Sequence, residues 1–167
     1  KLDLARMLAR KGEVVGANVK GVEFLFRKNK VTWLKGEGSI QAPGTVSVAG
    51  RDYSAKHIVI ASGSESIPLP GVEVDEKQIV TSTGGLELTA VPKHLVVIGG
   101  GYIGLEAAAV ASKKGLKVTL VEMAERILQR VAAPQTSDYF RAAHQGHGVT
   151  IREGIGLDRL LGDGHVT

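Results

Sequence analysis

The chain has 167 residues, 43% of them hydrophobic, a formal net charge of +4 at pH 7 and no cysteine. This length allows one ordinary domain or two small ones with a sizeable core. The lack of cysteine excludes a disulfide framework, a thiolate metal site and a redox-active cysteine pair within these residues. No apolar run approaches the roughly 20 residues of a membrane span, and the charged start KLDLARMLARKGE lacks the apolar core of a signal peptide. We therefore expect a soluble protein that does not enter a membrane.

The charged residues and histidines give no sign of a nucleic-acid or metal site. The basic residues between Lys11 and Lys30 are spread along one helical stretch, which is typical of a solvated face. His144 and His147 are three residues apart, and a solvated helix end explains them better than a metal site. We expect neither nucleic acid nor a metal ion to bind.

Both ends of the chain fall within predicted elements. Lys1 lies within an amphipathic helix, and Thr167 lies within a hairpin expected from two strands at 157–161 and 165–167 with a turn at 162–164. We interpret the chain as a segment of a longer protein.

The first half of the chain is predicted to contain one long helix and several short strands. Apolar residues at helical spacing predict a helix from Leu2 to about Asn29. A turn at residues 50–52 is expected to lead into a buried strand at residues 57–60. Residues 81–83 are expected to cap a short helix at residues 84–88. The strands expected after the long helix cover residues 31–34, 45–48 and 55–60.

The run from His94 to Glu122 is the most informative part of the sequence, because it has the pattern of a complete βαβ unit. Residues 95–98 form an apolar strand that leads into a G-x-G-x-x-G turn. A helix follows this turn and ends at Gly115, and residues 117–121 form a second strand. The side chains expected on the packed side of the helix are Leu105, Ala108 and Ala109.

The glycines of this turn have separate mechanical roles. Gly99 permits the sharp turn, Gly101 lets a pyrophosphate approach the backbone, and Gly104 lets the helix pack closely on the strand. The helix N-terminus offers N–H groups and a partial positive charge to phosphates. Glu122 follows Gly104 by 18 residues, which is about where an acid binds the 2′- and 3′-hydroxyls of an adenosine ribose. The pattern therefore predicts a bound dinucleotide.

Glu122 also favours one dinucleotide over another. A carboxylate accepts two ribose hydroxyls but repels the extra phosphate of NADP, so NAD is expected rather than NADP. Arg126 is placed to bind such a phosphate, but we favour a solvated arginine at a helix start. The motif alone does not exclude FAD.

The residues after Glu122 complete half of a doubly wound sheet. Residues 124–131 are expected to form a loop or a short helix, residues 136–145 a helix, and residues 149–152 a third parallel strand. The inward residues of that helix are expected to be Tyr139, Phe140 and Ala143. The order β-α-β-α-β predicts the α/β class with a Rossmann-like, doubly wound sheet.

Several segments together resemble one family, the FAD-dependent pyridine nucleotide–disulphide oxidoreductases, and within it most of all the dihydrolipoamide dehydrogenases. The resemblance runs from Leu2 to about Val121. From Glu122 onward the sequence is more similar to the flavin-dependent reductases of ferredoxins and rubredoxins, which share the fold and use no disulphide. The segments that carry the main resemblance are LDLARMLARKGEVV, VTWLKGEGSI, AKHIVIASGSESIPLPG and IVTSTGGLELTAVPKHLVVIGGGYIGLE.

The resemblance implies two cofactor domains. Residues 1–88 would be part of an FAD-binding domain, and residues 89–167 an NAD-binding domain truncated at its C-terminal end. Without the family, a β-turn and a Gly-rich strand exit would explain the FAD segments. The residues implied beside the FAD adenine are Gly36, Glu37 and Gly38. Those implied beside the FAD phosphates and ribose are Ala61, Ser62, Gly63 and Ser64, with Ser62 where the family usually has threonine.

The resemblance also gives roles to residues after the glycines. Tyr102 would shield the flavin until nicotinamide displaces it, or would simply cover the first helical turn. Glu106, implied with Tyr102 as a catalytic residue, would lie near the nicotinamide amide and a flavin-side lysine, or would otherwise be an exposed acid on the helix. Ile103 joins Tyr102, the glycines and Glu122 among the implied cofactor-binding residues.

The reaction implied is hydride transfer between NAD and flavin, coupled to the dihydrolipoamide–lipoamide pair. It needs a cysteine pair, an N-terminal FAD motif and a His–Glu base, and none of these is in this chain. We therefore expect the segment alone to be inactive.

Other readings of the whole protein stay open. Alternatives are a fragment of an NADH-dependent ferredoxin or rubredoxin reductase, or a non-catalytic nucleotide-binding module. The implied partners are a small molecule or a lipoyl domain of a 2-oxo acid dehydrogenase complex, with a homodimeric, cytoplasmic parent protein.

Overall fold

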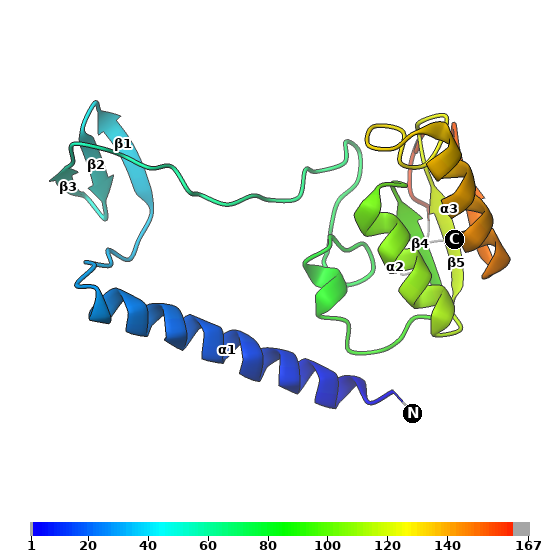
Figure 1. Ribbon diagram of the computed structural model, residues 1–167, viewed down its shortest axis with the longest axis horizontal. Helices are drawn as coiled ribbons and strands as arrows, with labels where there is room; N and C mark the ends of the chain where they lie inside the picture. The colour runs from blue at the N-terminus through cyan, green and yellow to red at the C-terminus, as the bar shows by residue number, and fades with distance from the viewer. Residues whose placement is uncertain (1, 162–167) are drawn as a thin grey trace. The chain divides into compact units, whose positions relative to one another are not determined.

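The computed structural model describes residues 2–161, which form two compact units that divide between Glu65 and Ser66 (Figure 1). The boundary predicted after residue 88 separates the parts of the chain that would bind different cofactors, whereas the structural boundary separates compact units. The cofactor boundary stays a prediction. No helix within the described residues is both long and apolar enough to cross a membrane.

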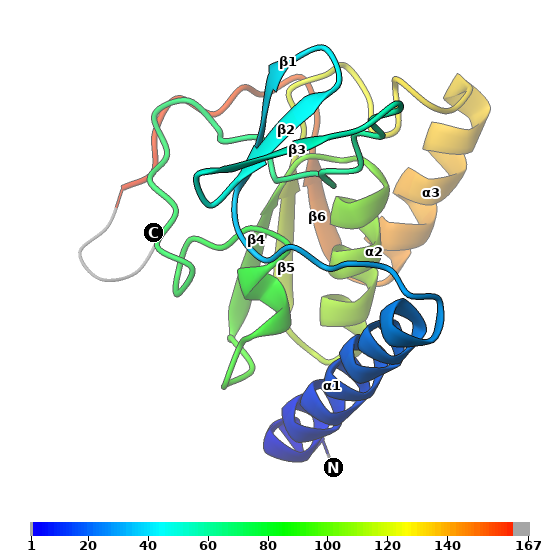
Figure 2. The same cartoon turned by 90° about the vertical axis from the view of Figure 1, so that its left-hand side faces the viewer.

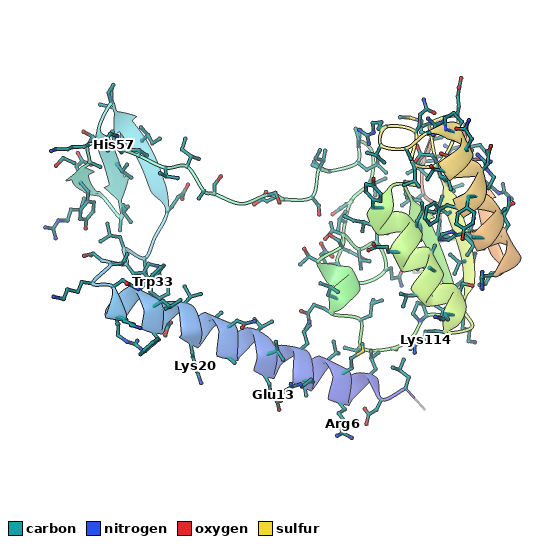
Figure 3. All side chains as sticks on the ribbon, viewed as in Figure 1. Arg6, Glu13, Lys20, Trp33, His57 and Lys114 are labelled. Carbon is teal, nitrogen blue, oxygen red and sulfur yellow. The ribbon has the colours of Figure 1, made fainter. Side chains whose placement is uncertain are left out.

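The first unit begins with the long helix that the sequence predicts, α1 (Leu4–Lys28). Asp3 caps its N-terminus, because its carboxylate accepts a hydrogen bond from the Arg6 N–H at 3.0 Å. Arg27 and Lys28 lie in the last turn, where positive charge complements the helix dipole. Arg6, Glu13 and Lys20 all project from α1 (Figure 3).

A three-stranded antiparallel meander follows, with β1 (Gly38–Ala42), β2 (Thr45–Val48) and β3 (Arg51–Ser54) in that order. The strand predicted at 45–48 is confirmed as β2. The turn is tighter than predicted, because Ala49 and Gly50 take φ of 51° and 78°, as in a two-residue type I′ hairpin. Arg51 and Asp52 consequently belong to β3, where they pair with Val48 and Ser47.

The strands predicted at residues 31–34 and 55–60 are wrong. Trp33 packs its ring edge-to-face on Phe26 at 5.7 Å, close to the end of α1 (Figure 3). The side chains of Val59 and Ile60 are 86% and 75% exposed rather than buried. A β-branched run forms a strand where it can pair and pack, and the described chain pairs no strand with it.

The second unit contains a parallel sheet with the order β4-β5-β6, formed by β4 (His94–Ile98), β5 (Lys117–Val121) and β6 (Val149–Arg152). The crossovers contain α2 (Tyr102–Lys113) and α3 (Pro134–Gly146). These helices lie side by side on one face of the sheet (Figures 1 and 2). His144 Nε2 lies 3.1 Å from the Leu105 carbonyl oxygen, and the Ser112 hydroxyl donates to the His147 carbonyl. This arrangement confirms the predicted α/β class.

The apolar core lies between the sheet and these two helices. On α2, Ala111 is buried and Ala109 is exposed, so the prediction of Ala109 as a packed residue is wrong. The buried apolar residues are Leu105, Ala108, Ala111, Val118, Leu120, Ile127, Leu128 and Val149.

The inward face of α3 is polar rather than apolar. Tyr139 is 69% exposed and Phe140 38% exposed, so the prediction that they point inward is wrong, while Ala143 is half-buried. Ser137 is the buried residue of this helix, and Arg141 is half-buried one turn further on. An apolar pattern could not reveal this face, because its side chains make hydrogen bonds.

Two further predictions concern the connections. The helix expected at residues 84–88 is a short 3-10 turn, η1 (Gly84–Leu86), without a side-chain cap. The segment at 124–131 is a loop, as predicted. Of the predicted C-terminal hairpin, residues 157–161 form no strand, and residues 162–167 lie outside the described residues.

The close contact of helix and strand at Gly104 gives a stability prediction. Gly104→Ala would press a methyl carbon against the Gly99 carbonyl oxygen and set it 3.1 Å from Val97 Cγ1. We expect the free energy of unfolding to fall by about 2 kcal/mol or more, because backbone cannot move aside as a flexible side chain can. Urea denaturation measures this change. Gly146→Ala, which would meet no atom within 4 Å, is the control, and equal effects of the two substitutions would contradict the packing described.

Candidate functional site

A cavity of about 460 Å³ opens beside the Gly-rich turn, where β4 and β5 end. Ligands of open parallel sheets bind at this carboxyl edge of the strands. The cavity is lined by Gly100, Gly101, Tyr102, Glu122, Ala124, Arg126, Leu128, Gln129, Arg130 and Val131.

The turn presents backbone to this cavity. Gly99 takes φ of 109°, and its N–H donates to the Val121 carbonyl oxygen at 2.8 Å. Gly101 is the N-cap of α2 and supplies no side-chain cap, so the first N–H groups of the helix are left for a ligand. A Cβ at Gly101 would meet nothing within 4 Å. Gly101 therefore borders open space in the cavity.

The carboxylate of Glu122 is fixed at the cavity wall by two backbone donors. The Gly100 N–H donates to Oε2 at 2.6 Å, and the Ala124 N–H donates to Oε1 at 2.8 Å. An ionised carboxylate has about four acceptor positions, so capacity remains for two hydroxyl donors. The side chain is half-buried and needs no reorientation to meet a ligand in the cavity.

Gly100 is a site residue that the sequence reasoning missed. A Cβ there would lie 2.7 Å from Ile127 Cγ2 and 3.1 Å from Glu122 Oε2. Its carbonyl oxygen accepts from the Leu128 N–H at 2.9 Å. The signal was the uninterrupted run of three glycines, in which the middle one occupies a variable position of the motif.

The loop of residues 124–131 is held at Ile127 by two side chains from outside the loop, Glu153 and Ser137. Its N–H donates to Glu153 Oε1 at 2.7 Å, and its carbonyl oxygen accepts from the buried Ser137 hydroxyl at 2.6 Å. Arg126 Nη1 donates to the same hydroxyl oxygen at 2.6 Å. The prediction of a solvated Arg126 at a helix start is therefore wrong, because Arg126 is half-buried and lies on a loop.

Glu153 is in turn held by Arg141. Arg141 donates through Nε to Oε2 at 2.7 Å and through Nη2 to Oε1 at 3.0 Å. Burial raises the pKa of Glu153, but the hydrogen bonds from Arg141 and the Ile127 N–H outweigh burial, and the net pKa is lowered. The hydrogen bond from Arg141 to Glu153 raises the pKa of the guanidinium, with Asp138 adding to the effect.

The structure brings part of the predicted NAD site together. Tyr102 and Glu122 line the cavity with Gly101, while Ile103 and Glu106 are exposed on α2 and do not line it. The exposure of Glu106 means that its charge carries no burial cost. Within residues 2–161, no group of three or more histidines, aspartates or glutamates is placed to hold a metal ion.

The residues implied for FAD lie in the first unit. Gly36 takes φ of 142°, and Glu37 precedes Gly38, the first residue of β1, which pairs with Val48. The residues implied beside the FAD phosphates and ribose are exposed and lie outside any helix or strand, and they are Ala61, Ser62, Gly63 and Ser64.

A parallel sheet with a Gly-rich turn after one strand and a fixed carboxylate after the next defines an α/β dinucleotide-binding unit. The chain belongs to the pyridine nucleotide–disulphide oxidoreductase family, which it matches over residues 3–167. Members of this family are oxidoreductases that use FAD and NAD.

Its relatives include a dihydrolipoyl dehydrogenase and a leghemoglobin reductase. The chain is 54% identical to dihydrolipoyl dehydrogenase 3 of Pseudomonas aeruginosa over 132 residues, which cover 76% of the chain and 28% of the relative. It is 44% identical to leghemoglobin reductase of Vigna unguiculata over 171 residues, which cover 98% of the chain and 32% of the relative. The chain thus spans about a third or less of these relatives.

Solved structures show the same fold. The ferredoxin reductase for the CYP199A2 system of Rhodopseudomonas palustris matches with a TM-score of 0.73 and 30% identity, over 87% of this chain and 38% of that one. The HOCl-induced flavoprotein disulfide reductase RclA of Escherichia coli matches with a TM-score of 0.79 and 26% identity, over 95% and 37%.

The Glu153 pairing predicts how stability depends on pH. Because the folded-state pKa of Glu153 lies below its ordinary value of 4.5, its ionised form stabilises the fold above that pH, and the contribution is lost as the pH falls through the folded pKa. We expect wild type to exceed Glu153→Gln in unfolding free energy at neutral pH and the difference to shrink in acid. Urea denaturation at stepped pH measures this difference.

The control for this experiment is Asp138→Asn. Asp138 also contacts Arg141, but its side chain is 68% exposed against 18% for Glu153, so the substitution should change stability little. A difference between wild type and Glu153→Gln that stays constant through acid pH would contradict the account.

Proposed function

We propose that the chain carries the NAD site and part of the FAD site of an oxidoreductase of the dihydrolipoyl dehydrogenase type, which transfers a hydride between NAD and flavin. The observation that carries the proposal is the carboxylate of Glu122, held by the Gly100 N–H at 2.6 Å on the wall of the cavity beside the helix N-terminus. This geometry matches a dinucleotide, which has a diphosphate next to a ribose.

Different residues bind different parts of NAD. The N–H groups at the start of α2 bind the diphosphate near Gly101, because the helix end is uncapped and the space beside it is open. Glu122 accepts the ribose hydroxyls. Tyr102, Ile103 and Glu106 follow along α2 toward the nicotinamide, with Tyr102 as the residue that covers the flavin until nicotinamide enters.

The FAD contacts rest on backbone. Gly63 takes φ of 78° with nothing within 4 Å of its missing Cβ, in an exposed segment that a phosphate can approach. Gly36 to Gly38 precede and begin β1 and border the adenine. FAD, when bound, accepts and donates the hydride.

The dithiol half of the reaction needs cysteines, and these 167 residues contain none. The chain alone therefore binds NAD and turns nothing over. In the intact protein the partner is lipoamide or a lipoyl domain of a 2-oxo acid dehydrogenase complex, and the protein is a homodimer. A cytoplasmic location stays a prediction, and a relative from Pisum sativum is named as mitochondrial.

A second candidate is an NADH-dependent ferredoxin or rubredoxin reductase. It is supported by the sequence after Glu122 and by the likeness to the ferredoxin reductase of Rhodopseudomonas palustris at 30% identity. Here the acceptor is an iron–sulphur protein and no cysteine pair is required. Comparing NADH-driven reduction of lipoamide and of a ferredoxin by the intact protein separates the two candidates.

Glu122→Gln tests the site directly. The substitution keeps one carbonyl oxygen for the Gly100 N–H but removes the charge that binds the ribose hydroxyls. We expect the dissociation constant for NADH, measured by fluorescence titration of the intact protein, to rise about tenfold.

Glu125→Gln removes the same charge from an exposed position of the neighbouring loop and serves as the control. Equal affinities of wild type and Glu122→Gln for NADH would refute the proposed site. For the chain alone, NADH-driven dye reduction at an enzyme-like rate would refute the proposal that it is inactive.

A further inference from the structure

Arg126 lines the same cavity as Glu122, and two of its N–H donors bind to uncharged groups of the protein. Its Nη1 donates to the Ser137 hydroxyl oxygen at 2.6 Å, and its Nη2 donates to the Gln129 carbonyl oxygen at 3.3 Å. Both acceptors are uncharged, so they orient the guanidinium without neutralising its charge. A positive charge is thus held on the wall beside the carboxylate, pointed at the protein.

Ser137 is built to hold this arrangement. It is fully buried on α3, with 0% of its surface exposed. Its single hydroxyl proton goes to the Ile127 carbonyl oxygen at 2.6 Å, so the oxygen is left to accept from Arg126. The same hydroxyl therefore fixes the backbone of the loop and the direction of the next side chain.

A free guanidinium at this wall would have a different use. An arginine near the ribose binds the 2′-phosphate of NADP. Its guanidinium can make bidentate hydrogen bonds to a phosphate. The hydrogen bonds to Ser137 and Gln129 hold Nη1 and Nη2 of Arg126, so they break when the guanidinium turns toward a phosphate. The contacts to α3 and to its own loop thus oppose a reorientation of Arg126 toward a 2′-phosphate.

We propose that Ser137 is a specificity-determining residue of the dinucleotide site, because its hydroxyl ties Arg126 to α3 and keeps it from pairing with a 2′-phosphate. Ser137 is a positioning residue and does not touch the cofactor. This inference rests on the proposed function, in which Glu122 binds the adenosine ribose.

The test measures the dissociation constants of NADH and NADPH for the intact protein by fluorescence titration. We expect wild type to bind NADH more tightly than NADPH. Ser137→Ala releases Arg126, and the ratio of the NADPH to the NADH dissociation constant falls about fivefold or more, mainly through tighter NADPH binding. Ser137→Thr keeps the hydroxyl and restores the wild-type ratio.

Two double variants assign the effect to Arg126. Adding Arg126→Gln to Ser137→Ala removes the gain in NADPH binding. Adding Arg130→Gln, which removes the same charge from the same cavity wall, leaves the gain in place. A loss of stability alone would not distinguish these two arginines.

Arg126→Gln in the otherwise unchanged protein covers the case in which Ser137→Ala does not fold. The proposal expects this variant to change the ratio less than about twofold, because a tied arginine contributes little to NADPH binding. A large further loss of NADPH affinity would overturn the proposal, as would an unchanged ratio in folded Ser137→Ala. Failure of wild type to bind NADH would instead refute the proposed function, so the two failures are distinguishable.

Discussion

The turn after β4 and the loop after β5 are joined by one carboxylate. The Glu122 carboxylate accepts hydrogen bonds from the Gly100 N–H at 2.6 Å and from the Ala124 N–H at 2.8 Å. It therefore links the backbone of the turn to the backbone of the loop. A side chain at Gly100 would collide with Ile127 and crowd Glu122, which means that the acid in this position requires a glycine in the turn. The fold and the proposed cofactor site therefore depend on the same contact.

Polar side chains extend this constraint away from the cavity. Ser137 and Glu153 bind the carbonyl and the N–H of Ile127, and Arg141 binds Glu153 from α3. Each buried polar side-chain atom of the described residues has a hydrogen-bond partner. These hydrogen bonds compensate for the loss of water around the buried polar groups. A loop without regular structure is thereby held in one conformation, as a binding wall must be.

The sequence allowed much of this to be predicted. Strand β5 was predicted with its observed bounds, and the role of Gly104 agrees with the close approach of its neighbours, because strand pattern and glycine spacing are local properties. The inward face of α3 was not predictable, since the buried Ser137 and the half-buried Arg141 are held by hydrogen bonds to residues outside the helix. The exposure of Val59 and Ile60 was not predictable either, because an apolar run does not reveal whether a strand lies beside it.

The central claim is that the backbone of the glycine turn and the carboxylate of Glu122 bind the adenosine diphosphate portion of a dinucleotide. Hydrogen–deuterium exchange of the intact protein, with and without ADP-ribose, tests it most directly, because backbone N–H groups are the proposed ligands. The account predicts slower exchange in peptides that cover Gly99 to Gly104 and Glu122 to Val131. Protection confined to other peptides, with these two unchanged, would contradict it.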